Sequence, residues 1–217
     1  MIKVMLVDDH DLVRTGIRRL LEDVSDIDVV GEAASGETAL EQVEAAGPDV
    51  VLMDINMPGI GGLEATRKLL RRNPDLRIII VTMHDDDLFP QRLMKAGAMG
   101  YLTKGAQIDE ILRAIRSVMA GKRYIAPEIA QQMAISSFDG NEGSPFDSLS
   151  EREMQVLLMM MDGQSVSAIS DKLCLSPKTV STYRSRLFSK LGVQNDIELA
   201  RLALLHGVVE STVNLKA

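Results

Sequence analysis

The chain has 217 residues, of which 46% are hydrophobic and 25% charged, so it is long enough for one large globular domain or two small ones. This composition excludes a disordered or collagen-like chain, and the single cysteine excludes an internal disulfide framework or a cysteine-rich zinc site. The net charge of −7 is divided unevenly, with −6 in residues 1–121, −2 in residues 122–147 and +1 in residues 148–217. We therefore consider the segments separately.

The chain begins with a short apolar run that ends at Asp8 and Asp9. This run is too short and too acidic for a signal peptide. No apolar run approaches the roughly 18 residues of a membrane span. We expect a cytoplasmic protein without a membrane partner.

Short apolar runs alternate with amphipathic patterns over the first 120 residues. The runs are continuous and rich in branched side chains, which is typical of strands buried on both faces of a parallel sheet. We expect strands at residues 2–7, 29–33, 50–53, 78–82 and 99–102. We expect helices at residues 11–23, 36–45, 62–72, 86–95 and 108–120. Five strand–helix units in succession predict an α/β domain with a doubly wound, five-stranded parallel sheet.

The pattern changes after residue 121. A short helix is expected at 129–135, and residues 136–145 combine polar side chains with glycine and proline, which indicates a linker. Beyond residue 148 only helical patterns occur, at 151–161, 166–173, 177–191 and 197–206, with candidate N-caps at Ser150, Ser165, Ser176 and Asn195. We predict a first domain at 1–121, a linker at 122–147, an all-α helix-turn-helix domain at 148–210 and a tail at 211–217.

Polar residues follow four of the five expected strands. They are Asp8 and Asp9, Asp54, Thr82 and Lys104. Ligands of a parallel α/β sheet bind at the carboxyl ends of its strands, so these side chains should converge. Three carboxylates need a cation, and oxygen ligands favour a hard ion such as Mg²⁺. The set suits phosphoryl transfer to Asp54, with the metal, Lys104 and the Thr82 hydroxyl offsetting charge on the phosphoryl group.

The order and spacing of Asp8-Asp9-His10, Asp54 with the following Asn56 and Pro58, Thr82, and Tyr101 with Lys104 resemble the receiver domain of bacterial response regulators. The resemblance implies a flavodoxin-like fold and phosphorylation of Asp54 by a histidine kinase or a small phosphodonor. It also implies Mg²⁺ held by Asp9, Asp54 and the Asn56 backbone carbonyl, with Asp8 assisting through water. Thr82 and Tyr101 resemble the pair of switch residues that respond to the phosphate.

Two alternatives remain open beside this resemblance. A phosphatase of the haloacid-dehalogenase type also uses a nucleophilic Asp at a strand end, but it needs a general acid two residues later. Asn56 stands there and cannot deliver a proton, which favours a phosphate held as a signal with at most slow self-dephosphorylation, and not an enzyme. The second alternative is a receiver that acts by protein contact alone.

The helix expected at 177–191 carries four cations and no acid, in a chain of net charge −7. Long cations interleaved with small hydroxyls suit insertion into a DNA groove, because they reach phosphates and base edges. A solvated basic face is the alternative explanation of this pattern. The candidate DNA contacts are Lys178, Thr179, Ser181, Thr182, Arg184, Ser185, Arg186, Ser189 and Lys190, with Arg184 and Lys190 at the rims.

The residues around this helix, from Leu149-Ser150-Glu151 to Leu191-Gly192-Val193, resemble the LuxR-type DNA-binding domain. A receiver followed by this domain is the arrangement of the NarL/FixJ class of response regulators, and within it the chain is similar to the global activators. The resemblance implies promoter DNA as a partner, activation of transcription, and a homodimer when phosphorylated or bound to DNA. Two copies of the basic helix would also double the phosphate contacts on a two-fold site.

Overall fold

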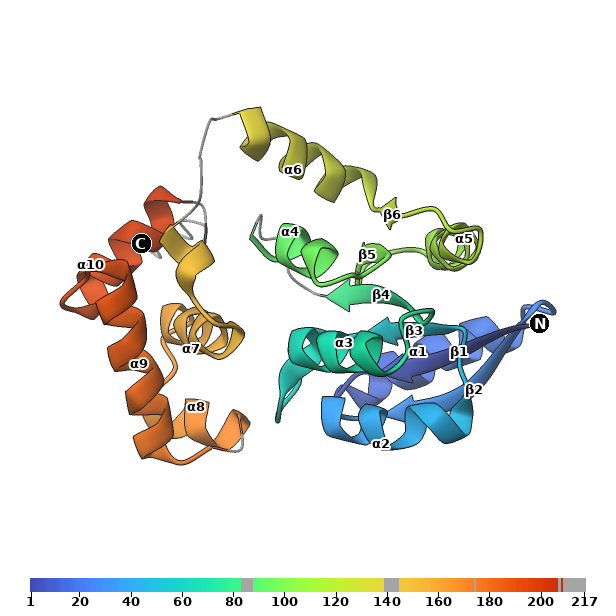
Figure 1. Ribbon diagram of the computed structural model, residues 1–217, viewed down its shortest axis with the longest axis horizontal. Coiled ribbons are helices and arrows are strands. Elements are labelled where there is room, and N and C mark those ends of the chain that lie inside the picture. Colours follow the sequence, from blue (N-terminus) through green and yellow to red (C-terminus); the bar gives the residue numbers. More distant parts are fainter. Residues whose placement is uncertain (83–87, 139–144, 174, 207, 209–217) are drawn as a thin grey trace, which may run out of the picture. The chain divides into compact units, whose positions relative to one another are not determined.

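The computed structural model describes residues 1–82, 88–138, 145–173, 175–206 and 208 (Figure 1). The predicted tail at 211–217, part of the predicted linker (139–144), the first two residues of the helix expected at 86–95, and Cys174 lie outside the described residues. The chain divides into two compact units, one of Met1–Asp85 and Phe89–Met133 and the other of Asp86–Leu88 and Ala134–Ala217.

The first unit is built on a six-stranded parallel sheet of order β2-β1-β3-β4-β5-β6. The strands are β1 (Ile2–Val7), β2 (Ile27–Ala33), β3 (Val50–Met53), β4 (Arg77–Thr82), β5 (Gly100–Thr103) and β6 (Tyr124–Ile125). Its central strand β3 is buried along its whole length, and β4 is buried from its second residue onward. Continuous apolar runs therefore predicted the buried strands correctly, because both faces of a parallel sheet are covered by helices.

Helices connect the strands. They are α1 (Asp11–Glu22), α2 (Gly36–Ala46), α3 (Gly61–Arg72), α4 (Leu88–Lys95) and α5 (Ile108–Met119). The strand order changes direction at β1, so crossovers of one hand place helices on both faces of the sheet. The predicted doubly wound α/β architecture is confirmed, and the described ends of these elements lie within two residues of the expected ones.

The sixth strand corrects the predicted strand number of five. Strand β6 consists of Tyr124 and Ile125 alone and pairs in parallel with β5 at Gly100 and Tyr101. Two residues are too few to produce a readable hydrophobic pattern. A helix follows, α6 (Pro127–Phe138), which is longer than the one expected at 129–135 and lies, like β6, within the segment 122–147 that was predicted as a linker. The first unit thus runs to Met133.

In the described part of the second unit, the end of α6 is followed by a short 3₁₀ turn and four helices. The turn is η1 (Pro145–Ser148), and the helices are α7 (Glu151–Met161), α8 (Val166–Lys172), α9 (Pro177–Leu191) and α10 (Asp196–Leu205). Each helix begins at the predicted N-cap, whose side chain accepts the backbone N–H three residues later. At the start of α7, the Glu153 side chain also accepts the backbone N–H of Ser150, and this second bond completes a capping box. The predicted helical character of this unit is confirmed.

A small apolar core holds α7, α8 and α9 together. Val156 on α7, Ile169 on α8 and Val180 on α9 are fully buried against one another. Helix α9 ends at Leu191 and is followed by the C-cap residue Gly192, which takes the left-handed conformation that favours glycine at this position. Among the described helices of either unit, none is both long and apolar enough to cross a membrane.

Candidate functional site

The ends of β1 and β3 bring the predicted carboxylates together. Val7 and Met53 are paired in the sheet register, so Asp8 and Asp54 follow at neighbouring positions. The Asp54 N–H donates to the Val7 carbonyl at 2.8 Å. The ladder thus continues one residue past the end of β3 and fixes Asp54. This is the point where the strand order changes direction, at which doubly wound sheets bind their ligands.

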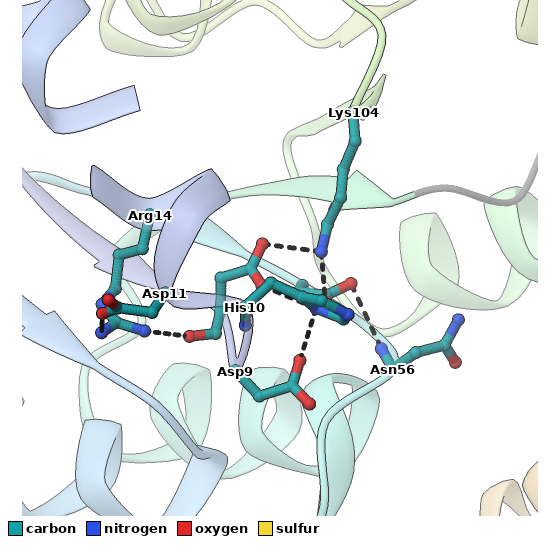
Figure 2. A network of polar contacts seen from close by, with 8 residues as sticks. Asp9, His10, Asp11, Arg14, Asn56 and Lys104 are labelled. Atoms are coloured by element: carbon teal, nitrogen blue, oxygen red, sulfur yellow. Dashed lines mark hydrogen bonds and ion pairs between the residues drawn. The ribbon is translucent and has the colours of Figure 1, made fainter. Parts of the chain in front are cut away.

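Lys104 compensates the negative charge of two of these carboxylates. Its Nζ lies 2.7 Å from Asp8 Oδ2 and 2.9 Å from Asp54 Oδ2 (Figure 2). The three side chains are between 2% and 7% exposed. A buried ammonium is held by a buried carboxylate pair, so removal of any one partner leaves an uncompensated charge away from water.

The same contacts set the protonation of the pocket. Burial raises the pKa of Asp54, and the nearby Asp8 charge adds to this, while Lys104 and the Asn56 N–H act in the opposite direction. The net result is a pKa above the ordinary value of 3.8. Burial lowers the pKa of Lys104, but its hydrogen bonds to Asp8 and Asp54 outweigh burial and leave this pKa above its ordinary value. Lys104 therefore stays charged beside Asp54.

Asp9 and His10 complete the cluster. One ligand atom from each of Asp8, Asp9, His10 and Asp54 can be chosen so that all four lie within 4.8 Å of one another. The Asp9 Oδ1 atom is buried and accepts no hydrogen bond. His10 Nδ1 lies 2.9 Å from this atom. A buried oxygen without a donor is suited to a cation ligand.

The other predicted receiver residues occupy the neighbouring strands. Thr82 at the end of β4 and Tyr101 in β5 are both fully buried. The Lys104 N–H donates to the Thr82 carbonyl at 2.7 Å, which ties the end of β5 to the end of β4. The Tyr101 carbonyl accepts the Ala126 N–H at 3.0 Å, so the chain just after β6 is attached to the strand that carries this ring.

The loop after β3 lies close to Asp54. The Asn56 N–H donates to Asp54 Oδ1 at 3.3 Å, and Gly62 at the start of α3 donates to the Ile55 carbonyl at 2.9 Å. A Cβ atom at Gly62 would lie 1.9 Å from the Asp54 carbonyl oxygen. Only glycine permits this close approach of α3 to the residue that bears the carboxylate. No pattern in the sequence indicates this role of Gly62.

Arg14 is a second residue near the pocket that sequence patterns do not indicate. Its guanidinium donates to the Asp8 carbonyl at 2.7 Å (Figure 2) and also to Glu32 Oε2, which lies outside that view, at 2.9 Å. Glu32 in turn accepts from Arg18 at 2.8 Å. This network fixes the backbone of Asp8 from the side of α1 and β2. No local pattern indicates it, because Arg14 and Glu32 are 18 residues apart in the sequence.

Helices α8 and α9 form a helix-turn-helix in the second unit. On α9, Val180 and Leu187 are buried, while Lys178, Ser185 and Arg186 are exposed. Ser181, Thr182, Ser189 and Lys190 are exposed as well, so the predicted DNA face is open to solvent. Thr179 is half-buried, and its N–H donates to the Ser176 cap at 3.1 Å.

The two cations predicted at the rims have partners within the unit. Arg184 pairs with Asp196 at 2.6 Å, and its guanidinium lies 5.1 Å from the centre of the Phe188 ring. Lys190 pairs with Glu153 at 2.7 Å and donates to the Ser148 carbonyl at 3.0 Å. Within the part of the chain that the structure describes, Lys178 and Arg186 have no ion pair, so these two cations on α9 are free to meet phosphates.

A phosphoacceptor-like pocket on a doubly wound sheet, followed by a helix-turn-helix unit, defines the class of two-component response regulators. Residues 4–116 match the family described as "Response regulator receiver domain", and residues 147–203 match "Bacterial regulatory proteins, luxR family". The chain belongs to the response regulators with a LuxR-type output domain. These matches confirm the predicted class of response regulators and not the phosphatase alternative.

The similar relatives identify the subfamily. The chain is 59% identical to the response regulator GacA of Pseudomonas aeruginosa, over 97% of this chain and 99% of that protein. It is 56% identical to the response regulator UvrY of Escherichia coli, over 96% of both chains. The structure is similar to that of RcsB of Salmonella enterica serovar Typhimurium bound to a promoter, with a TM-score of 0.60 and 27% identity over 96% of this chain and 99% of that one.

Proposed function

We propose that Asp54 accepts a phosphoryl group from a sensor histidine kinase and that the phosphorylated chain binds promoter DNA through α9 to activate transcription. The observation that carries the proposal is the buried contact of Lys104 with Asp54 and Asp8 at the switch point of the sheet. It supplies a nucleophilic carboxylate and a positive charge for the phosphoryl oxygens in one place. The phosphodonor site of a sensor kinase and promoter DNA are both accessible in the cytoplasm, so we expect the protein to act there.

The pocket fits a divalent cation. Asp9 Oδ1 is buried and accepts no hydrogen bond, and the carboxylates of Asp8, Asp9 and Asp54 belong to one cluster. We expect Asp9, Asp54 and the Asn56 carbonyl to hold Mg²⁺, with Asp8 assisting through water. When bound, Mg²⁺ supplies positive charge to the phosphoryl oxygens.

The transfer itself needs only one nucleophile. An Asp54 carboxylate oxygen attacks the phosphorus, the bond from phosphorus to the donor nitrogen breaks, and the nitrogen leaves with the bonding electrons. Lys104 neutralises the charge gained by the pocket, and the Thr82 hydroxyl donates to a phosphoryl oxygen. Tyr101 lies on the neighbouring strand β5, and we expect it to respond to this change as the second switch residue. Since Asn56 offers no proton, self-dephosphorylation is expected to be slow.

The second unit supplies the output. Lys178 and Arg186 on α9 contact phosphates or base edges, and Ser181, Thr182, Ser185 and Ser189 lie close to the bases. A homodimer places two copies of α9 on a two-fold site. RcsB, similar to this chain over most of its length, has been described as dimers bound to DNA, which supports this proposal. Exposed Ile197, Leu204 and Leu205 on α10 offer apolar surface for a second copy.

The test compares wild type with Asp54→Ala, incubated with Mg²⁺ and acetyl phosphate. Mass spectrometry should detect one phosphoryl group on wild type and none on the variant. DNA affinity should rise on incubation for wild type but not for Asp54→Ala. Asp75→Ala, which removes an exposed carboxylate at the turn before β4, serves as the control and should behave as wild type. Equal DNA binding by wild type and Asp54→Ala, with and without donor, would contradict the proposed switch.

A further inference from the structure

The guanidinium of Arg14 joins the turn after β1 to the neighbouring strand β2. Its Nη1 donates to the Asp8 carbonyl at 2.7 Å, its Nη2 donates to the Asp11 carboxylate, and its Nε donates to Glu32 Oε2 at 2.9 Å. The contacts with Asp8 and Asp11 can be followed in Figure 2. The side chain of Arg14 is only 14% exposed, so this guanidinium is part of the packed structure and not a solvated charge.

The contact with the Asp8 carbonyl fixes a peptide group that joins two of the expected cation ligands. The Asp8 N–H donates to the Ala33 carbonyl at 3.0 Å, which holds the preceding peptide group against β2. The Asp8 carbonyl and the Asp9 N–H belong to one rigid plane, so a guanidinium on this carbonyl also orients the backbone of Asp9. The Oδ1 atom of Asp9 is buried and accepts no hydrogen bond. The direction in which the Asp9 carboxylate points therefore depends on Arg14.

We propose that Arg14 is a positioning residue for the cation site and holds the peptide plane between Asp8 and Asp9 so that both carboxylates face a divalent cation. The inference rests on the proposed cation site of Asp8, Asp9 and Asp54 and deepens it. Arg14 acts through the backbone of these residues and does not touch the cation. Residues that orient metal ligands from outside the coordination sphere typically contribute about ten- to a hundredfold to metal affinity.

The positive charge of Arg14 predicts the opposite effect on cation affinity. A guanidinium close to a cation site repels the cation, so the loss of its charge alone would strengthen Mg²⁺ binding. Positioning requires the reverse, because a peptide plane that is free to turn must be ordered when the cation binds. The sign of the change in Mg²⁺ affinity therefore separates positioning from charge balance.

Arg18 provides a matched control on the same helix. It donates to Glu32 Oε1 at 2.8 Å and pairs with Glu22 at 3.1 Å, so it shares one partner with Arg14. Among the described residues, Arg18 has no hydrogen bond to the turn that follows β1. Arg18→Met thus removes the same charge from α1 without freeing the peptide plane that Arg14 holds.

Isothermal titration calorimetry of Mg²⁺ binding to the full chain measures the effect. Arg14→Met should weaken Mg²⁺ binding about tenfold, whereas Arg18→Met should leave it within about twofold of wild type or strengthen it. Arg14→Lys keeps the charge but lacks the planar fork that holds three acceptors, so it should weaken binding by about threefold or more.

Phosphorylation by acetyl phosphate gives a second readout. The Mg²⁺ concentration at half the maximal rate should rise about tenfold in Arg14→Met, while the rate at saturating Mg²⁺ stays within about twofold of wild type. A loss of folded protein alone would lower the maximal rate and leave this Mg²⁺ concentration unchanged.

Mg²⁺ binding by Arg14→Met that equals or exceeds that of wild type overturns the inference and assigns Arg14 to charge balance or folding. Wild-type affinity in Arg14→Lys also overturns it, because the charge would then suffice. Equal weakening in Arg14→Met and Arg18→Met overturns it as well, since the shared partner Glu32 would then explain the effect. If wild type binds no Mg²⁺, the proposed cation site fails together with the inference. If circular dichroism shows that Arg14→Met does not fold, the affinity of Arg14→Lys decides.

Discussion

The ammonium of Lys190 on α9 lies 2.7 Å from the Glu153 carboxylate on α7, which is only 3% exposed. Lys190 therefore connects the DNA-facing helix to the first helix of its unit. Lys190→Ala should lower the free energy of unfolding by about 1–2 kcal/mol, less than for a fully buried pair because the lysine is 39% exposed. Urea denaturation measures this. Lys172→Ala, at an exposed lysine on α8, is the control and should change the free energy of unfolding by less than about 0.5 kcal/mol.

The same pair gives the output unit a dependence on pH. Burial raises the pKa of Glu153, but hydrogen bonds from Lys190 and Ser150 outweigh burial and hold the pKa below its ordinary value of 4.5. The unfolded chain therefore takes up the proton first as the pH falls. The stabilisation is complete above the ordinary pKa and is lost as the pH falls through the lowered one.

This dependence is measured as the difference in unfolding free energy between wild type and Glu153→Gln, from about pH 6 to about pH 3. The difference should be largest near pH 6 and should shrink on acidification. A difference that stays constant over this range would show that the ionised carboxylate of Glu153 does not stabilise the unit.

Local patterns predicted most of the fold and much of the pocket. Buried parallel strands are continuous apolar runs, so the strand ends could be located, and with them Asp8, Asp54, Thr82 and Lys104. The four N-caps of the second unit were also predictable, because a cap and its N–H are three residues apart.

Contacts between distant residues could not be predicted in this way. Arg14 with Glu32, and Lys190 with Glu153, join helices and strands through side chains that carry no local signal. The contact of Lys190 changes the interpretation of a basic helix face, since a cation that stabilises the unit is less available to DNA. Strand β6 escaped prediction for another reason, because it consists of only two residues.

Arg186 and Arg184 should differ in their effects on DNA binding. Arg186 is exposed, so Arg186→Ala should weaken DNA binding by about 1–3 kcal/mol without loss of stability. If Arg186 contacts a phosphate, the slope of the logarithm of the binding constant against the logarithm of the salt concentration should also fall by about one unit in magnitude. Arg184→Ala should lower the melting temperature as well, because the pair with Asp196 and the contact with Phe188 are lost.

Fluorescence anisotropy with promoter DNA at several salt concentrations tests these effects. Lys122→Ala, at an exposed lysine between α5 and β6, is the control for a change of net charge outside α9. Equal losses of affinity in Arg186→Ala and Lys122→Ala would contradict a specific role of α9. Loss of Asp54 phosphorylation in Arg186→Ala would contradict the assignment of the two functions to separate units.

Removal of the Lys104 charge should destabilise the first unit. Lys104→Met leaves the buried carboxylates of Asp8 and Asp54 uncompensated at pH 7, and the unfolding free energy should fall by about 3 kcal/mol. Mg²⁺ should restore part of this loss, because a cation that binds only the folded pocket stabilises it. Lys68→Met, which removes a half-exposed partner of Glu64, should cost less than about 1 kcal/mol. Unchanged stability of Lys104→Met would show that the pocket tolerates its negative charge without the lysine.

The close approach of α3 to Asp54 gives a steric prediction at Gly62. In Gly62→Ala the new Cβ would lie 1.9 Å from the Asp54 carbonyl oxygen, and this backbone atom cannot yield without shifting the phosphoacceptor. We expect a loss of about 1–3 kcal/mol in stability and slower phosphorylation of Asp54 by acetyl phosphate. Gly16→Ala is the matched control, because Gly16 lies in α1 with no atom within 4 Å of an added Cβ. It should gain about 0.5–1 kcal/mol through higher helix propensity. Phosphorylation of Gly62→Ala at the wild-type rate would show that the Asp54 backbone need not be held by α3.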